Sequence, residues 1–248
     1  MLKRLPWLIS LFAILSVFFL VGLIFFQFPF PLYPLVSWKD VIDLITPFSI
    51  VPLYWLMFKA ASRRSPGWLE DVAFITLSSL CVLGQGMHLT ANSIGNLTEY
   101  YSESGRLNIL DTEIYALTYF FDEKLGHYLW HTAIIGMAVL LIVREWRVPS
   151  GETASRWVLV AAGLLHGGTL FIIFVEGQTT PLGFPFALLA SLVLLALGAR
   201  KFKERPLLVF FFTSFIAAAI LMAIWGFYFH GFPELSEFSV FNIPQIYR

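Results

Sequence analysis

Three polar residues at helical spacing stand out in an otherwise apolar part of the chain. Glu123, His127 and His131 follow one another at intervals of four residues, which places them along one face of a helix. Two histidines one turn apart can give two imidazoles to a single metal ion. The acid one turn earlier, or its neighbour Asp122, can act as a third ligand, as a general base or as the carboxylate that orients a histidine.

Other histidines also lie in apolar segments, where ionisable side chains are costly and usually functional. His88 shares a helical face with Asn92, and Gln85 lies one turn away. His166 shares a face with Glu176 ten residues later. These polar neighbours are the residue types that orient and support a metal ligand.

The depth of each histidine in a membrane follows from a rise of 1.5 Å per residue. Measured from the outer end of each segment, His88 lies about 6 Å deep and His127 about 7–8 Å deep. Adjacent helices would therefore bring these two side chains together. His131 and His166 lie about 13–15 Å deep and form a second layer.

These spacings predict a site for a divalent metal ion, zinc or iron, in the outer half of a helix bundle. His230, at the end of the last apolar segment, is expected to be an interfacial residue. Asp43 is expected to lie one turn into the interface, in contact with water. The candidate metal ligands are His88, His127, His131 and His166, the candidate acid–base residues are Asp122 and Glu123, and the supporting residues are Asn92, Gln85 and Glu176.

The composition indicates that lipid surrounds these residues. Hydrophobic residues make up 58% of the 248 positions and charged residues only 13%, about half the share in a soluble domain. This excludes a soluble enzyme and a disordered chain. The net charge of zero, from 16 basic and 16 acidic residues, argues against a nucleic-acid partner. The single cysteine, Cys81, excludes an intrachain disulfide and a thiolate zinc cluster.

Apolar runs long enough to cross a hydrocarbon core of about 30 Å predict an all-α fold with seven transmembrane helices in one domain, residues 1–248. The first run is too long for the core of a signal peptide and has no small-residue cleavage site, so we expect a retained helix. A loop is expected over residues 95–119. The predicted helices span residues 6–28, 41–58, 72–94, 120–143, 157–175, 185–197 and 206–229.

Lysine and arginine in the loops predict the orientation, because cytoplasmic loops are enriched in them. The inner set contains Lys3, Arg4, Lys59, Arg63, Arg64, Arg144, Arg147, Arg156, Arg200, Lys201, Lys203 and Arg205, and the outer set contains Lys39, Arg106, Lys124 and Arg248. The asymmetry predicts a cytoplasmic N-terminus and an outer C-terminus, which requires an odd number of spans. The host membrane is expected to be the plasma membrane, the inner membrane or an organelle membrane.

Three functions are compatible with these residues. The first is an intramembrane metalloenzyme that acts on a lipid or another hydrophobic substrate, either hydrolysing an ester or amide or oxidising a chain. The second is a b-type haem protein, with His88 and His127 or His131 and His166 as axial ligands. The third is a transporter or a non-catalytic subunit of a membrane complex, whose histidines lie on an ion path or in a hydrogen-bonded polar core.

Seven helices with histidine and aspartate ligands resemble in their ingredients the alkaline ceramidase and adiponectin-receptor superfamily. That superfamily has its paired HxxxH motif in the last helix. Here His127 and His131 lie in the fourth predicted helix. The order of motifs therefore differs, and no residue role is carried over from the superfamily.

Overall fold

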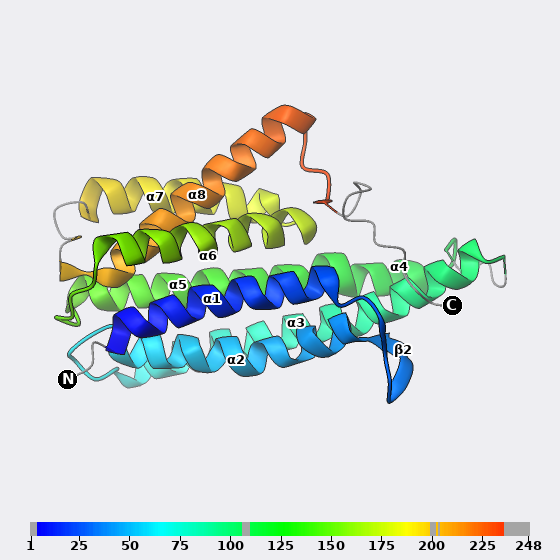
Figure 1. The fold of residues 1–248 in the computed structure, drawn as a ribbon, viewed down its shortest axis with the longest axis horizontal. Helices are drawn as coiled ribbons and strands as arrows, with labels where there is room; N and C mark the ends of the chain where they lie inside the picture. The colour runs from blue at the N-terminus through cyan, green and yellow to red at the C-terminus, as the bar shows by residue number, and fades with distance from the viewer. Residues whose placement is uncertain (1–3, 106–109, 199–201, 203, 236–248) are drawn as a thin grey trace.

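The computed structural model describes residues 4–105, 110–198, 202 and 204–235. Within them the chain is almost entirely helical (Figure 1), which confirms the predicted all-α class. The helices are α1 (Arg4–Phe25), α2 (Trp38–Ala60), α3 (Trp68–Glu103), α4 (Glu113–Tyr119), the π-helix η1 (Phe120–Gly126), α5 (His127–Arg147), α6 (Arg156–Glu176), α7 (Thr180–Gly198) and α8 (Pro206–Phe229).

The protein is an integral membrane protein. Among the described residues, six helical segments are long and apolar enough to cross a membrane, and α4, η1 and α5 together form one of them. The seventh predicted span corresponds to α7, whose apolar part is shorter, Thr180–Ala196. Six residues used for the orientation lie outside the described residues: Lys3, Arg106, Arg200, Lys201, Lys203 and Arg248.

The helices pack mainly in three pairs, α6 with α8, α3 with α5, and α1 with α2. In Figure 1 most axes run side by side, while α8 crosses α6 and α7 obliquely. α1 also packs against α6 and so connects the α1–α2 pair to the rest of the bundle. The centre is filled by fully buried aromatic side chains, among them Phe12, Tyr54, Phe58, Phe174 and Phe210.

The loop predicted over residues 95–119 is wrong in most of its length. α3 continues to Glu103, so its 36 residues reach about 54 Å, well beyond a hydrocarbon core. α4 begins at Glu113, where the Thr112 side chain accepts a hydrogen bond from the N–H of Tyr115. Apolar runs mark only the part of a helix that lies in lipid, and a polar helix can continue into water without them.

Two other helix boundaries differ from prediction. α1 ends at Phe25 rather than at residue 28, and a short antiparallel hairpin of β1 (Pro29–Phe30) and β2 (Tyr33–Ser37) follows it. α7 begins at Thr180 rather than at residue 185, so Pro185 lies inside the helix. The hairpin leads into α2, where Ser37 and Asp40 cap the helix start reciprocally.

Candidate metal site

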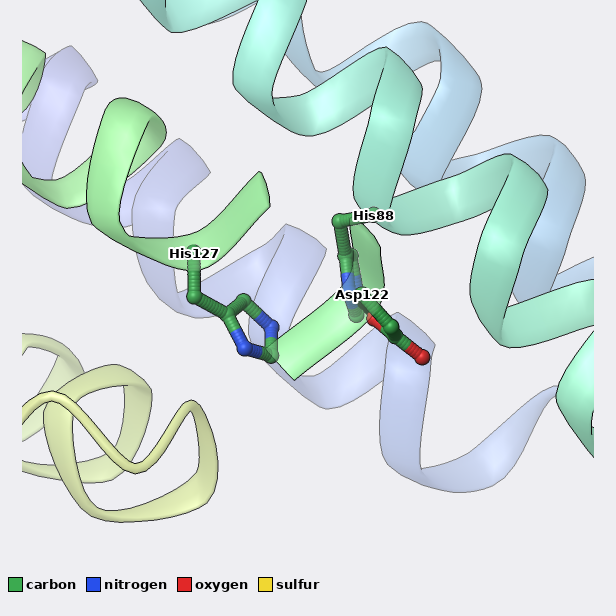
Figure 2. Close-up of side chains that lie close together, drawn as sticks. All are labelled: His88, Asp122 and His127. Atoms are coloured by element: carbon green, nitrogen blue, oxygen red, sulfur yellow. Dashed lines mark hydrogen bonds and ion pairs between the residues drawn. The ribbon is translucent and has the colours of Figure 1, made fainter. Parts of the chain in front are cut away.

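A wide π-helical turn, η1, positions the acids of the predicted site. The backbone N–H of His127 donates to the carbonyl of Asp122, five residues earlier. In a regular α-helix five residues turn through about 500°, which would separate these two side chains by about 140°. The wider turn instead lets Asp122 face the same space as His127, as Figure 2 shows. π-helical turns of this kind are frequent at functional sites.

Two glycines allow η1 to touch α3 closely. A Cβ atom on Gly84 would lie 2.5 Å from the backbone N of Trp130, and one on Gly126 would lie 2.9 Å from the backbone N of His88. Neither position therefore has room for a side chain. Because the two backbones meet here, His88 of α3 lies directly beside Asp122 of η1.

His88, Asp122 and His127 form a compact ligand cluster. His88 Nδ1 lies 2.5 Å from Asp122 Oδ1, and the ring centroids of the two histidines are 4.3 Å apart. One ligand atom from each of the three residues lies within 4.8 Å of the others. Two imidazole nitrogens and one carboxylate oxygen are a usual zinc or non-haem iron donor set. Three protein ligands would leave a position for water or substrate.

Unpartnered buried atoms beside the cluster support this fit. His127 Nδ1, His131 Nε2 and Glu123 Oε2 are buried and have no hydrogen-bond partner. Buried polar atoms nearly always have a partner, so each exception needs an explanation. Glu123 Oε2 lies 3.2 Å from His127 Nδ1, the i to i+4 contact that the spacing predicts. A cation bound among these atoms would satisfy electron pairs that the protein leaves unused.

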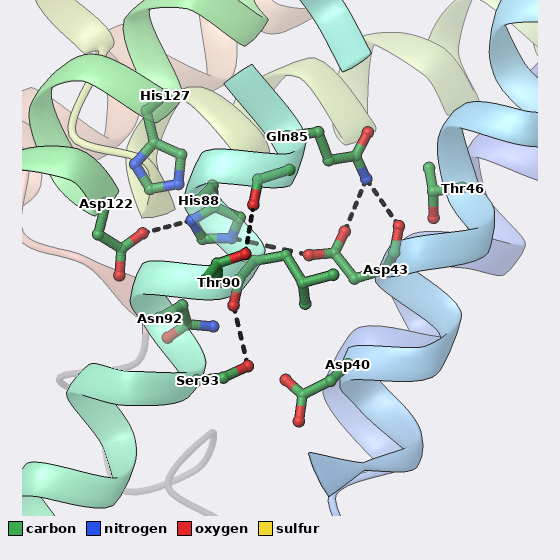
Figure 3. A network of polar contacts seen from close by, with 12 residues as sticks. Asp40, Asp43, Thr46, Gln85, His88, Thr90, Asn92, Ser93, Asp122 and His127 are labelled. Carbon is green, nitrogen blue, oxygen red and sulfur yellow. Dashed lines mark hydrogen bonds and ion pairs between the residues drawn. The ribbon is translucent and has the colours of Figure 1, made fainter. Parts of the chain in front are cut away.

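His88 is also held from the opposite side by α2. Its Nε2 atom lies 3.8 Å from Asp43 Oδ2, and Gln85 Nε2 donates to the Asp43 carboxylate at 2.8 Å and to its backbone carbonyl at 2.9 Å (Figure 3). Asp43 is only 3% exposed, so the expectation that it contacts water at the interface is wrong. Both ring nitrogens of His88 therefore face carboxylates, from Asp122 and from Asp43.

His131 lies one turn deeper, next to the cluster. Its ring stacks on that of His127 with centroids 5.5 Å apart. Its Nδ1 atom is 2.5 Å from Thr179 Oγ1, and the side chain is 1% exposed. The structure therefore places His131 beside the three clustered ligands but with one nitrogen already engaged.

His166 is not brought to the cluster. Its Nδ1 atom lies 3.1 Å from Ser214 Oγ, and its ring packs against the rings of Phe12 and Phe210. His230 is exposed at the end of α8, in a left-handed conformation with φ of 53°. Among the histidines, His88, His127 and His131 are therefore the ones that gather in one place.

The haem pairs proposed from the sequence are not supported by this arrangement. Axial ligands hold the iron from opposite faces of a porphyrin, whereas the rings of His88 and His127 are in direct contact at 4.3 Å. His166 is enclosed by Ser214 and phenylalanine rings.

The cluster opens into a cavity of about 610 Å³ between the helices. Asn92 and Glu176 line it, whereas Gln85 acts from behind through Asp43. Lys39 is the one lysine or arginine among the described residues that line the cavity. The acidic residues that line it are Asp40, Glu99, Asp122, Glu123, Glu176 and Glu234.

Three of the acids that line the cavity, Asp40, Glu99 and Glu234, were not predicted as site residues, and Asp43 was expected at the interface. Asp40 and Asp43 lie three residues apart in an apolar segment, and this spacing places them on one helical face. That signal could have placed both of them inside the bundle. Glu99 and Glu234 lie beyond the apolar runs, in stretches that the sequence alone does not locate relative to the site.

The chain is similar to two curated proteins. It is 23% identical over 197 residues to the ceroid-lipofuscinosis neuronal protein 6 homolog of Canis lupus familiaris. It is 24% identical over 217 residues to ceroid-lipofuscinosis neuronal protein 6 of Homo sapiens. Each alignment covers 74% of this chain and 60% of the relative, so the chain spans about 60% of the length of the relatives it matches. No protein-family profile and no solved structure matches the chain.

Proposed function

We propose that this protein is a metal-dependent membrane enzyme that acts on a hydrophobic substrate. The observation that carries the proposal is the cluster of His88, Asp122 and His127, whose ligand atoms lie within 4.8 Å of one another at the wall of a large cavity. The bound ion is zinc or iron, because these metals accept imidazole and carboxylate ligands together. Imidazole and carboxylate side chains at the wall of a large cavity best fit the hydrolysis of a lipid ester or amide.

Different residues of the cavity would have different roles in such a reaction. A bound zinc ion supplies a nucleophilic hydroxide at neutral pH. Glu123 lies next to His127 and its Oε2 atom is free of hydrogen bonds, so it can accept a proton from the attacking water. Asp43 Oδ2 lies 3.8 Å from His88 Nε2, on the side where carboxylates orient metal-bound histidines.

The second candidate is a role in moving protons or cations. It is favoured by His88, whose two ring nitrogens face Asp122 and Asp43, since alternating imidazoles and carboxylates form proton relays in membrane proteins. The two candidates differ in their need for metal. An enzyme of the proposed type requires one bound ion, while a proton relay keeps its function in a chelator.

Metal analysis of the purified full chain tests the proposal. After zinc loading and dialysis we expect about one ion per chain in the parent, because the cluster offers one set of three ligands. His127→Ala should lose the ion, since one ligand is removed. His230→Ala and His166→Ala should keep it, because those histidines lie away from the cluster. A parent without metal, or a His127→Ala variant that retains it, overturns the proposal.

We also propose that α7 crosses the membrane as the seventh span, with the N-terminus cytoplasmic and the C-terminus outside. The excess of Lys and Arg in the inner set supports this orientation. Cysteine labelling should place Ser102→Cys and Ser150→Cys on opposite sides, with Ser102→Cys outside. If α7 crosses, Gln178→Cys and Glu204→Cys also label from opposite sides. Labelling of the last two from one side refutes the seventh span.

A further inference from the structure

An apolar groove of about 480 Å³ lies on the surface of α3 where α4 and η1 pack against it. Leu83, Ile94 and Phe121 contribute to its walls and are themselves exposed. The hydroxyl groups of its two threonines, Thr90 and Thr118, donate to carbonyls of their own helices. The groove therefore offers hydrocarbon surface to any occupant, and in a membrane-spanning helix that occupant is an acyl or alkyl chain.

The groove and the polar cavity share part of their walls. Ala91 and Thr118 line both spaces. Both side chains are small, so a thin wall separates the lipid-facing groove from the cavity that contains the metal cluster. A molecule lying partly in each space would pass between these two residues.

The charges of the cavity indicate which polar group would enter it. Asp40 accepts hydrogen bonds from Ser37, and Glu99 accepts one from the Tyr115 hydroxyl at 2.6 Å. The donors in these hydrogen bonds are neutral groups. Among the described residues that line the cavity, Lys39 is the one lysine or arginine, whereas six residues are acidic. The His131 Nε2 atom, deeper in the same cavity, is buried without a partner.

We propose that the substrate is a single-chain amphiphile with a positively charged amine head. Its hydrocarbon chain lies in the groove, passes between Ala91 and Thr118, and places the ammonium group among the outer carboxylates Asp40 and Glu99. The inference rests on the proposed function for the reaction, but the binding itself does not require metal. Entry from the bilayer spares the chain from crossing water, which is the costly step for a hydrophobic molecule.

Photolabelling of the full chain in lipid nanodiscs tests this inference. The probes are octadecylamine and octadecanol, each with a diazirine in the middle of the chain, and labelled residues are mapped by mass spectrometry. Labelling of Leu83, Ile94 and Phe121 is divided by that of Leu189, a lipid-exposed residue of α7. We expect this ratio to be about tenfold higher for the amine, the effect of one charge-assisted hydrogen bond. Equal ratios for the two probes overturn the charged head.

Two matched glycine variants test the position of the chain. A Cβ atom on Gly86, in the groove, meets nothing within 4 Å, and the same holds for Gly168 on α6. Gly86→Leu places a side chain in the groove, with open space at its Cβ atom, and should reduce the amine ratio about tenfold, to the level of octadecanol. Gly168→Leu should leave it unchanged. A Gly86→Leu ratio equal to that of the parent overturns the groove as the binding place.

Metal content measured in the same samples separates the two proposals. If the parent binds the amine in the groove but contains no metal after zinc loading, the enzymatic proposal fails and the binding inference stands. If the parent holds metal and neither probe is enriched in the groove, the binding inference fails and the metal site stands.

Discussion

The two ends of the bundle, called the inner end and the outer cavity after the proposed orientation, both contain buried charged residues, but they satisfy them differently. At the inner end, Arg144 is 3% exposed and donates from Nε to Phe58 O at 3.1 Å, from Nη2 to Arg64 O at 2.9 Å and from Nη1 to Glu70. Every nitrogen of this guanidinium group has a partner. In the outer cavity, His127 and His131 each keep a buried ring nitrogen without a hydrogen bond, although His127 Nδ1 lies 3.2 Å from Glu123 Oε2.

This difference separates a polar group that holds helices together from one that is prepared for a ligand. Arg144 joins the last turn of α5 to the end of α2, the loop after α2 and the start of α3. Glu145 beside it accepts the N–H of Leu208 at the start of α8 at 3.0 Å, where the helix dipole favours a carboxylate. The second carboxylate oxygen of Glu145, Oε1, is buried without a hydrogen bond, unlike the nitrogens of Arg144. The cavity, in contrast, concentrates its unpartnered atoms around one ligand cluster.

Removal of the Arg144 side chain should have the largest effect on the free energy of unfolding. Arg144→Ala removes the donor from two carbonyl groups and leaves the Glu70 carboxylate with the N–H of Gly67. Breaking a buried pair costs about 3–5 kcal/mol of unfolding free energy. Arg147→Ala, an exposed arginine on the same helix, is the matched control and should change little. Chemical unfolding in lipid nanodiscs measures both. Equal unfolding free energies for the two variants would show that Arg144 is not a structural clamp.

The outer cluster should become stabilising only when it binds metal. Free zinc at about 100 times its dissociation constant raises the unfolding free energy by about 2.7 kcal/mol, because it binds the folded state. We expect this gain in the parent and in Arg147→Ala, and its loss in His127→Ala. The measurement is the shift of the unfolding midpoint with and without chelator. If a chelator still lowers the unfolding midpoint of His127→Ala, zinc does not stabilise the protein through this cluster.

The helix contact that brings the cluster together should tolerate no side chain. In Gly84→Ala the new Cβ atom meets the backbone of Trp130 at 2.5 Å, so we expect a loss of about 1–3 kcal/mol from overpacking together with reduced zinc binding. Gly86→Ala is the control two residues away. Its Cβ atom meets nothing within 4 Å, and the variant should gain up to about 1 kcal/mol from helix propensity. Unfolding and zinc titration of both variants decide whether their effects have opposite signs.

The smallest effect is expected for an exposed ion pair at the inner end. Lys59 Nζ lies 3.2 Å from Asp71 Oδ1, with both side chains more than a third exposed. Lys59→Ala should cost about 0–1 kcal/mol, the usual range for exposed pairs. A loss as large as that of Arg144→Ala would mean that charge alone, rather than burial with full hydrogen bonding, holds the inner end.

The sequence contained enough information for the helical class and for part of the site. Long apolar runs identify membrane helices because the backbone must satisfy its own hydrogen bonds in lipid. The spacing of Glu123 and His127 survives in the structure as a 3.2 Å contact. The depth estimate also places His88 level with His127, and their rings are in contact. These features depend on local spacing, which a sequence displays directly.

The remaining features depend on contacts between distant segments. The π-helical turn of η1 lies where Gly84 and Gly126 bring two helices together, and no local pattern around residue 122 reveals that contact. The burial of Asp43 depends on the rotation of α2 and on Gln85, 42 residues later. The separation of His166 from the cluster depends on which helices are neighbours. Spacing within one segment does not determine any of these.

The π-helical turn has a consequence for the phase of the whole segment from Glu113 to Arg147. Each residue of an α-helix advances the chain by about 100° around the axis, and a π turn contains a residue more than its α-helical equivalent. Deleting one residue from Phe120–Gly126 would therefore rotate α4 by roughly 100° relative to α5 while keeping both helices intact. Tyr115 and Thr118 would then turn away from the cavity. The width of this one turn thus determines which side of α4 faces the cavity.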